Sequence, residues 1–127
     1  MREIKFRVFD KKIGKIFKAH DLRFTAEEAI YEVCHDTIRD DGGKHWEFTD
    51  FKEVVLMQYT GLKDIEGKEI YEGDIILGYN NPHVVTFADG AFYLTYKNSS
   101  VRLSITCGAL KIIGNIFENP ELTQTTS

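Results

Sequence analysis

Residues 56–74 read LMQYTGLKDIEGKEIYEGD, and this stretch decides the fold that the sequence predicts. A second stretch, IIGNIFENPEL at residues 112–122, again combines a glycine with an aromatic ring. Gly61, Gly67 and Gly73 are spaced as glycines are when short strands turn sharply into one another, and the tyrosines between them are large enough to fill a small core. Neither stretch sets a nucleophile beside a base, so both indicate a structural scaffold and no reaction centre.

The segments that follow predict short strands joined by tight turns. The loop at residues 64–67 is typical of a hairpin in which glycine takes a positive φ angle, and we expect the side chains of Asp64 and Asp74 to cap turns. Asp89-Gly90 between two apolar runs is a strong hairpin signal. Strands spaced about eight to twelve residues apart are typical of a small barrel or sandwich, which we place at residues 59–122.

The N-terminal half predicts a hairpin followed by one helix. Residues 4–9 alternate apolar and charged side chains, as a half-buried strand does, and residues 11–14 supply a turn. Thr25-Ala26-Glu27-Glu28 matches a helix capping box, and apolar residues then recur at helical spacing as far as Ile38. The sequence therefore predicts a helix after the opening hairpin.

Length and composition fit one globular domain. The chain has 127 residues, of which 43% are hydrophobic and 13% aromatic, a composition that favours strands. The N-terminus has no apolar signal segment and no run is long enough to span a bilayer, so we expect a cytoplasmic protein with no membrane contact. The expected parts are a hairpin-plus-helix subdomain at 1–58, a small β-barrel at 59–122 and a disordered tail at 123–127.

Three segments carry a resemblance to a known family. MREIKFRVFD at residues 1–10, LMQYTGLKDIEGKEIYEGDII at 56–76 and IIGNIFENPEL at 112–122 are together similar to the YopX protein family of bacteriophages and prophages. The resemblance implies a strand-rich fold and a phage or prophage origin, and it implies no activity, substrate or catalytic residue. The predicted fold class is mainly β with a minor α part, a YopX-like fold with an SH3-like barrel or pseudobarrel in the C-terminal half and one helix in the N-terminal half.

The patterns that would indicate an enzyme or a metal site are missing from the sequence. The glycines at 61 and 67 are separated by five residues where a phosphate loop needs four. The four histidines have no HxxxH or HExxH spacing, and Cys34 and Cys107 have no CxxC partner, so we interpret both cysteines as small buried hydrophobes. We predict no catalytic residue, no cofactor and no metal.

The leading functional hypothesis is a non-enzymatic phage accessory protein that binds a protein partner or serves in assembly, including as a homo-oligomer. Such a module would present an exposed barrel face or loop. Aromatic side chains near the predicted loops are the candidate contacts, although the same residues also fit a core or cross-strand pairs. They are Tyr79, Phe92, Tyr93 and Tyr96.

Two alternatives remain open. The first is a nucleic-acid-binding regulator that contacts phosphates through a basic N-terminal segment, although the net charge of −4 lacks the positive field of a non-specific binder. The second is a small enzyme that acts on a host metabolite or nucleotide in a deep polar pocket. The basic residues of the first alternative are Arg2, Lys5, Arg7, Lys11, Lys12, Lys15 and Lys18.

Overall fold

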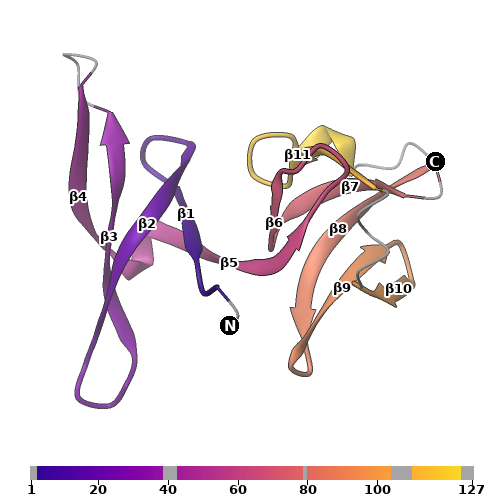
Figure 1. Cartoon of the computed structure of the whole chain (residues 1–127). Coiled ribbons are helices and arrows are strands. Elements are labelled where there is room, and N and C mark those ends of the chain that lie inside the picture. The colour runs from indigo at the N-terminus through magenta and orange to yellow at the C-terminus, as the bar shows by residue number, and fades with distance from the viewer. Residues whose placement is uncertain (1–2, 39–42, 79, 104–109, 124–127) are drawn as a thin grey trace. The chain divides into compact units, whose positions relative to one another are not determined.

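The computed structural model describes residues 3–38, 43–78, 80–103 and 110–123, without the side chains of Ile38 and Lys44 (Figure 1). The chain divides into two compact units, an N-terminal unit of Lys5–Met57 and a C-terminal unit of Met1–Ile4 with Gln58–Ser127. The sequence prediction placed a division between residues 58 and 59, and its proposed tail at 123–127 lies outside the described residues except for Thr123. No helix in the described ranges is long and apolar enough to cross a membrane.

The N-terminal unit is a sheet of long strands. Its strand order is β4-β3-β2-β1-β5, and β1 to β4 pair as successive antiparallel hairpins. The predicted opening hairpin is confirmed, because Val8 pairs with Phe17 across the turn that follows β1. The elements are β1 (Phe6–Asp10), β2 (Lys15–Phe24), β3 (Ile30–Ile38), β4 (Lys44–Asp50), the 3-10 turn η1 (Phe51–Glu53) and the first part of β5 (Val54–Lys63).

The helix predicted after residue 25 is wrong, because this segment forms the β2–β3 hairpin. The Thr25 hydroxyl, expected to cap a helix, accepts a hydrogen bond from the Ala29 backbone N–H at 3.3 Å within the hairpin turn. Glu28 sits at a φ of 65° in the same turn, which is not a helical conformation. In β3 the side chains of Val33, His35 and Thr37 alternate along the strand and are buried on one face of the sheet, and Cys34 is buried on the other face. Pairing of β3 with strands on both sides thus overrides the helical spacing of its apolar residues.

The core of the N-terminal unit lies on one face of its sheet. The residues Val8 and Val33 have no exposed surface, and Phe17 and Val54 are nearly as buried. They come from four strands that are not all consecutive, so the core depends on the sheet being assembled. At 20–33 cal/mol per Å² of apolar surface, burial of such side chains is the main stabilising term of a unit this small.

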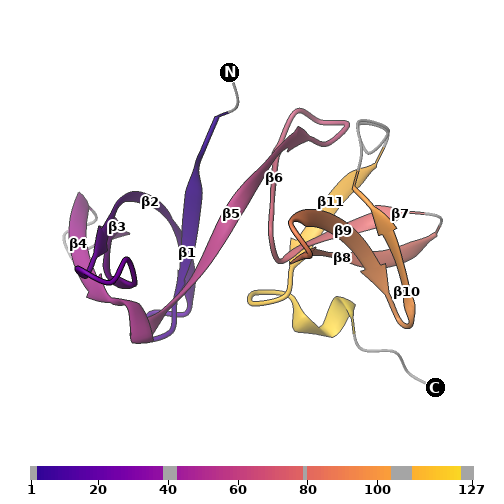
Figure 2. The same ribbon diagram turned by 90° about the horizontal axis from the view of Figure 1, so that it is seen from below.

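The C-terminal unit contains a second sheet, of order β10-β9-β8-β7-β11. Figure 2 shows β8, β9 and β10 following one another in this sheet. The later part of β5 pairs with β6, and Ile70 of β6 packs into the same cluster as Ile76 and Val85 of the sheet. The elements are β6 (Glu69–Tyr71), β7 (Asp74–Gly78), β8 (Asn81–Ala88), β9 (Ala91–Tyr96), β10 (Ser99–Arg102), β11 (Lys111–Asn115) and the 3-10 turn η3 (Pro120–Leu122).

The mainly β class is confirmed; of the barrel or pseudobarrel predicted for the C-terminal half, the described strands form no closed barrel. The five-stranded sheet is open, with β10 and β11 as its two edge strands, and no pairing closes it among the described residues. The sequence predicted short strands in this half but could not decide their closure, because closure depends on register and tilt between strands far apart in the chain.

The predicted hairpins of the C-terminal unit are confirmed. Gly67 has a φ of 80° in the loop between β5 and β6. Asp89 and Gly90 both have positive φ angles, 50° and 78°, and the flanking residues Ala88 and Ala91 pair directly, which is the geometry of a two-residue hairpin turn.

Asp64 and Asp74, in the stretch at residues 56–74, cap turns as predicted. One Asp64 oxygen accepts hydrogen bonds from the backbone N–H groups of Glu66 and Lys68, each at 2.9 Å, and the other accepts from Ile112 N–H at 3.0 Å. Burial by itself would raise the pKa of Asp64, but these three backbone N–H groups outweigh it and lower the pKa below its ordinary value. The Asp74 carboxylate accepts from Tyr71 N–H at 2.8 Å. Asp64 therefore ties the β5–β6 loop to β11.

Candidate functional site

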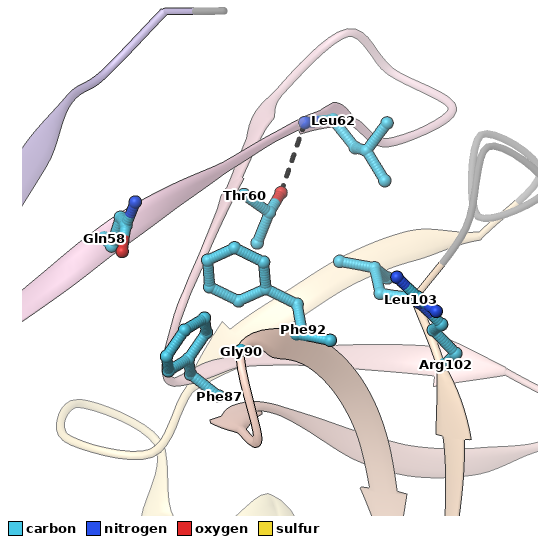
Figure 3. Close-up of a pocket in the computed structure, with 9 residues that line it drawn as sticks. Gln58, Thr60, Leu62, Phe87, Gly90, Phe92, Arg102 and Leu103 are labelled. Atoms are coloured by element: carbon cyan, nitrogen blue, oxygen red, sulfur yellow. Dashed lines mark hydrogen bonds between the residues drawn. The ribbon is translucent and has the colours of Figure 1, made fainter.

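The candidate site is a groove of about 410 Å³ in the C-terminal unit (Figure 3). Its walls come from the later part of β5, from the β8–β9 hairpin and from the end of β10. The residues that line the groove are Gln58, Thr60, Leu62, Phe87, Gly90, Ala91, Phe92, Arg102 and Leu103.

Two phenylalanine rings supply the aromatic part of this groove. The two-residue turn at Asp89-Gly90 places Phe87 directly opposite Phe92. Their ring centroids are 5.0 Å apart with planes inclined at 59°, a favourable arrangement for an aromatic pair. Strand alternation puts both rings on the same face as the buried side chain of Val85, so they extend the row of core residues to the end of the hairpin. Phe87 nevertheless keeps 48% of its surface exposed.

The β5 wall is held rigidly by hydrogen bonds that its own residues make. The Thr60 hydroxyl donates to the Ile70 carbonyl at 2.8 Å. It also accepts from Leu62 N–H at 3.2 Å, the bond drawn in Figure 3. The Gln58 backbone N–H donates to a Glu72 carboxylate oxygen at 2.9 Å. The Thr60 hydroxyl and the Gln58 and Leu62 backbone N–H groups are therefore already hydrogen-bonded within the unit. From this wall, the side chains of Gln58 and Leu62 remain to contact a ligand in the groove.

Arg102 supplies the charge of the groove. It is the one charged side chain among the described residues that line it, and it is exposed at the end of β10. The following residue is anchored, since Leu103 N–H donates to the Phe92 carbonyl at 2.9 Å. A guanidinium presents a planar fork of donors that matches a carboxylate or phosphate. The groove therefore combines apolar rings with one guanidinium, and its described lining contains no acid–base pair.

The aromatic residues that the sequence singled out do not gather on one surface. Phe92 lies in the groove. Tyr96 packs against His83, with ring centroids 5.5 Å apart, and borders a different hollow of about 270 Å³. Tyr93 pairs with Thr86 and, by strand alternation, lies on the opposite face of β9 from Phe92. Tyr79 lies outside the described residues.

Sequence reasoning missed Phe87 and Arg102. The Asp89-Gly90 signal was sufficient to find Phe87, because a two-residue turn fixes which residues face each other across a hairpin. No local signal points to Arg102, since its place beside the rings depends on how β10 pairs with β9.

The basic N-terminal residues are spread over a turn and a sheet face. Arg7 and Lys18 face each other on neighbouring strands, on the side opposite the buried pair Val8 and Phe17. The Lys11 ammonium donates to the Lys52 carbonyl at 3.0 Å. Lys12 lines a hollow together with four acidic residues. The residues that line this hollow are Asp10, Lys12, Ile13, Glu47, Phe48, Thr49, Asp50 and Glu53. Of the remaining residues, Lys15 is exposed, Lys5 is half-buried and Arg2 lies outside the described residues.

A buried polar cluster in the N-terminal unit is packed too closely to act as a site. His35 has no exposed surface, and its ring stacks on Phe17 with centroids 5.4 Å apart. Its Nδ1 donates to the Asp36 carbonyl at 2.6 Å, so in the neutral ring Nε2 accepts from the Thr49 hydroxyl at 2.9 Å. A carboxylate oxygen of Asp10 lies 3.7 Å from Nε2. Both ring nitrogens are thus committed to structural contacts.

Two further sequence interpretations concern thiols and metals. Cys34 is a free, buried thiol, and burial together with the nearby charge of Asp21 raises its pKa, which leaves little thiolate at neutral pH. Cys107 lies outside the described residues. Within the described part of the chain, no three His, Cys, Asp or Glu side chains come together in a way that would hold a metal ion.

Comparison with known proteins gives a family and a structural neighbour. Residues 5–124 match the family model described as YopX protein. The crystal structure of protein EF1440 from Enterococcus faecalis is similar to this chain, with 26% sequence identity, a TM-score of 0.72, and coverage of 98% of this chain and 100% of that one. No curated protein matches the chain.

Proposed function

The chain belongs to the YopX family, and from the chemistry of its groove we propose that it is a non-enzymatic binding module that holds a segment of a partner protein. The observation that carries the proposal is the Phe87–Phe92 pair, in which one ring is half exposed although it continues the core row of the sheet. Covering a ring of this kind is favourable by about 1.5–3 kcal/mol, and aromatic anchors in shaped grooves are typical of protein interfaces.

The groove also suggests which segment it takes. An apolar side chain of the partner packs against Phe87 and Phe92, and a carboxylate next to it in the partner pairs with Arg102. The absence of an acidic side chain from the described lining favours an acidic over a basic segment. We therefore propose a partner sequence in which an aromatic or leucine residue adjoins Asp or Glu.

The fold and setting of the module follow the family resemblance. We propose that the C-terminal unit is an SH3-like pseudobarrel, in which Ile70 of β6 covers the open sheet without closing it. We further propose that the protein serves a phage or prophage inside the bacterial host cell, alone or as a homo-oligomer.

Selection from a display library of random peptides tests this proposal. We expect the purified protein to enrich peptides with an aromatic or leucine residue beside an acidic one. Phe87→Ala should weaken binding of such a peptide about tenfold or more, and Arg102→Gln about fivefold, by fluorescence anisotropy. Phe24→Ala is the matched control, because Phe24 is exposed by 56% in the other unit, and it should leave affinity unchanged.

Three outcomes would contradict the proposal. The first is a library that yields no enriched sequence, and the second is a peptide that binds wild type and Phe87→Ala equally. The third is tight, steeply salt-dependent binding of a single-stranded oligonucleotide in place of peptides, since a ring and a cation also suit a base and a phosphate. The net charge of −4 makes us expect no such binding.

A further inference from the structure

The N-terminal unit carries an aromatic surface that the groove does not involve. Trp46 is exposed over 72% of its surface and Phe48 over 45%, and both lie on β4, the edge strand of its sheet. They are two residues apart, so their side chains share one face of the strand. Large rings that stay this exposed side by side are typical of interaction surfaces. We call this the tryptophan face.

Acidic side chains surround these rings. Strand register pairs Asp36 with Trp46 and pairs Glu32 with Asp50, so carboxylates flank the rings on β3 and on β4 itself. On β2, Asp21 pairs with Cys34, which in turn pairs with Phe48. Among the described side chains of β2 to β4, the charged and titratable residues of the tryptophan face are therefore Asp21, Glu32, Asp36 and Asp50 against Lys18 and Arg23, together with His20 and Cys34. The balance is negative.

The face already holds one guanidinium, and its geometry shows how a second would bind. The Arg23 guanidinium carbon lies 3.9 Å from the centroid of the Phe48 ring. The same guanidinium is 3.3 Å from a Glu32 carboxylate oxygen. A ring that stacks on the flat cation and a carboxylate that pairs with its edge thus form a complete arginine-binding unit.

Trp46 and Asp36 supply the same two kinds of group in a different register, because Glu32 lies diagonally to Phe48, whose direct partner is Cys34. Asp36 lies opposite Trp46, and its carboxylate contacts His20 Nε2. The His20 ring is tilted against the indole with centroids 5.4 Å apart, and it is the one ring or charge partner that Trp46 has among the described side chains. Tryptophan is the best ring for a cation to stack on, yet no arginine of the described chain occupies this one.

We propose that the tryptophan face binds an arginine-bearing, basic segment of a partner protein. The arginine guanidinium stacks on the exposed face of Trp46 and pairs with Asp36, as Arg23 does with Phe48 and Glu32 within the chain. Arginine fits better than lysine because its planar guanidinium can stack on the ring and donate two hydrogen bonds to the carboxylate at the same time. Trp46 lies on an edge strand, so an extended segment can approach it from the side.

The chain offers a direct reporter, because Trp46 is its sole tryptophan. The probe is a synthetic peptide of alternating arginine and glycine, with lysine–glycine and glutamate–glycine peptides for comparison. We expect the arginine peptide to change the fluorescence of Trp46 saturably, with an affinity at least about threefold higher than that of the lysine peptide. The glutamate peptide should produce no saturable change.

Variants locate the binding. Asp36→Asn should weaken the arginine peptide about fivefold, and Trp46→Ala should abolish its specific binding when a labelled peptide is followed by anisotropy. Both residues are on the surface of the sheet, so the variants should unfold at the same urea concentration as wild type. Phe87→Ala and Phe24→Ala, which change exposed rings elsewhere, should bind the peptide as wild type does.

Any one of three results would overturn the inference. The first is the lack of a saturable fluorescence change at low salt. The second is equal affinity for the arginine and lysine peptides, which would mean attraction to negative charge without stacking. The third is full retention of affinity in Asp36→Asn. Because Phe87→Ala separates the two surfaces, failure here leaves the groove proposal standing, and the reverse also holds.

Discussion

The two units build the same kind of sheet, but they place their buried polar groups differently. In the C-terminal unit the central cluster is aliphatic, with Ile70 and Ile76 fully buried, and buried carboxylates such as Asp64 cap turns. In the N-terminal unit the valines share the interior with His35, which hydrogen-bonds to Thr49 and lies close to Asp10. An aliphatic core is stabilised by the apolar surface area that it buries. A buried polar group, in contrast, is tolerated only while its hydrogen-bond partners stay in place. The N-terminal unit should therefore be sensitive to loss of a buried hydroxyl, and the C-terminal unit both to loss of volume in its aliphatic cluster and to loss of a buried carboxylate.

The groove and the tryptophan face differ in the sign of their charge. The groove of the C-terminal unit has Arg102 as its charged lining residue, and the tryptophan face of the N-terminal unit is dominated by carboxylates such as Asp36. One chain thus offers an apolar surface suited to an acidic segment and an aromatic surface suited to a basic one.

The largest expected effect comes from removing volume in the C-terminal core. Ile76→Ala should lower the free energy of unfolding by about 3 kcal/mol, because Ile76 is fully buried and the cavity cannot be refilled. The measurement is urea unfolding followed by circular dichroism. Leu77→Ala is the matched control, since the next residue of β7 is 44% exposed and should cost less than about 1 kcal/mol. Similar losses in the two variants would mean that the C-terminal unit does not depend on this core.

The second effect concerns the buried carboxylate that ties the β5–β6 loop to β11. Asp64→Asn should lower the free energy of unfolding by about 2 kcal/mol at pH 7, because asparagine has one acceptor oxygen and its NH2 group would face at least one of the three backbone N–H groups. The folded-state pKa of Asp64 is lowered, so its stabilisation is present above the ordinary aspartate pKa of about 4 and is lost as the pH falls through the folded value.

Unfolding of wild type and Asp64→Asn at pH 7 and pH 3 checks this sign. The difference between the two proteins should narrow at the lower pH. Asp89→Asn is the control, because Asp89 is an exposed turn residue whose positive φ asparagine also accepts. A difference that widens on acidification would show that the pKa of Asp64 is raised in the folded protein.

The third effect tests the polar core of the N-terminal unit. Thr49→Val keeps the side-chain shape but removes the hydroxyl that donates to His35 Nε2. We expect a loss of about 1 kcal/mol in the free energy of unfolding, since a buried ring nitrogen is left without its partner. Urea unfolding measures it, and an unchanged or higher stability would mean that His35 is held by packing alone.

The smallest expected effect is that of Glu28→Gly on the free energy of unfolding. Its sign distinguishes the observed hairpin from the helix that the sequence predicted. Glu28 has a φ of 65° in the β2–β3 turn, a conformation that glycine adopts without strain. Glu28→Gly should therefore raise the free energy of unfolding by about 0.5 kcal/mol. In a helix the same change would lower it by about the same amount or more, because glycine is a poor helix former. Thermal unfolding is sensitive enough to read the direction.

Prediction from the sequence worked where the signal was local. The turn at Asp89-Gly90 and the capping by Asp64 depend on a few neighbouring residues, and the structure has both. It failed at residues 25–38, where Thr25 and the following apolar spacing fit a helix and a hairpin equally well and strand pairing decided between them. Only part of the groove was predicted from the sequence. Phe92 was named as a candidate contact, Phe87 was not, and no local pattern points to Arg102.

The sequence by itself determined the strand-rich class, the family and the positions of the tight turns, because these follow from side-chain chemistry within a few residues. The tertiary structure alone decided that β3 is a strand, that the C-terminal sheet stays open, and which side chains meet at the groove and on the tryptophan face. The physical reason is that strand pairing joins residues distant in the chain. Register then assigns every second side chain to one face, and no local pattern encodes that assignment.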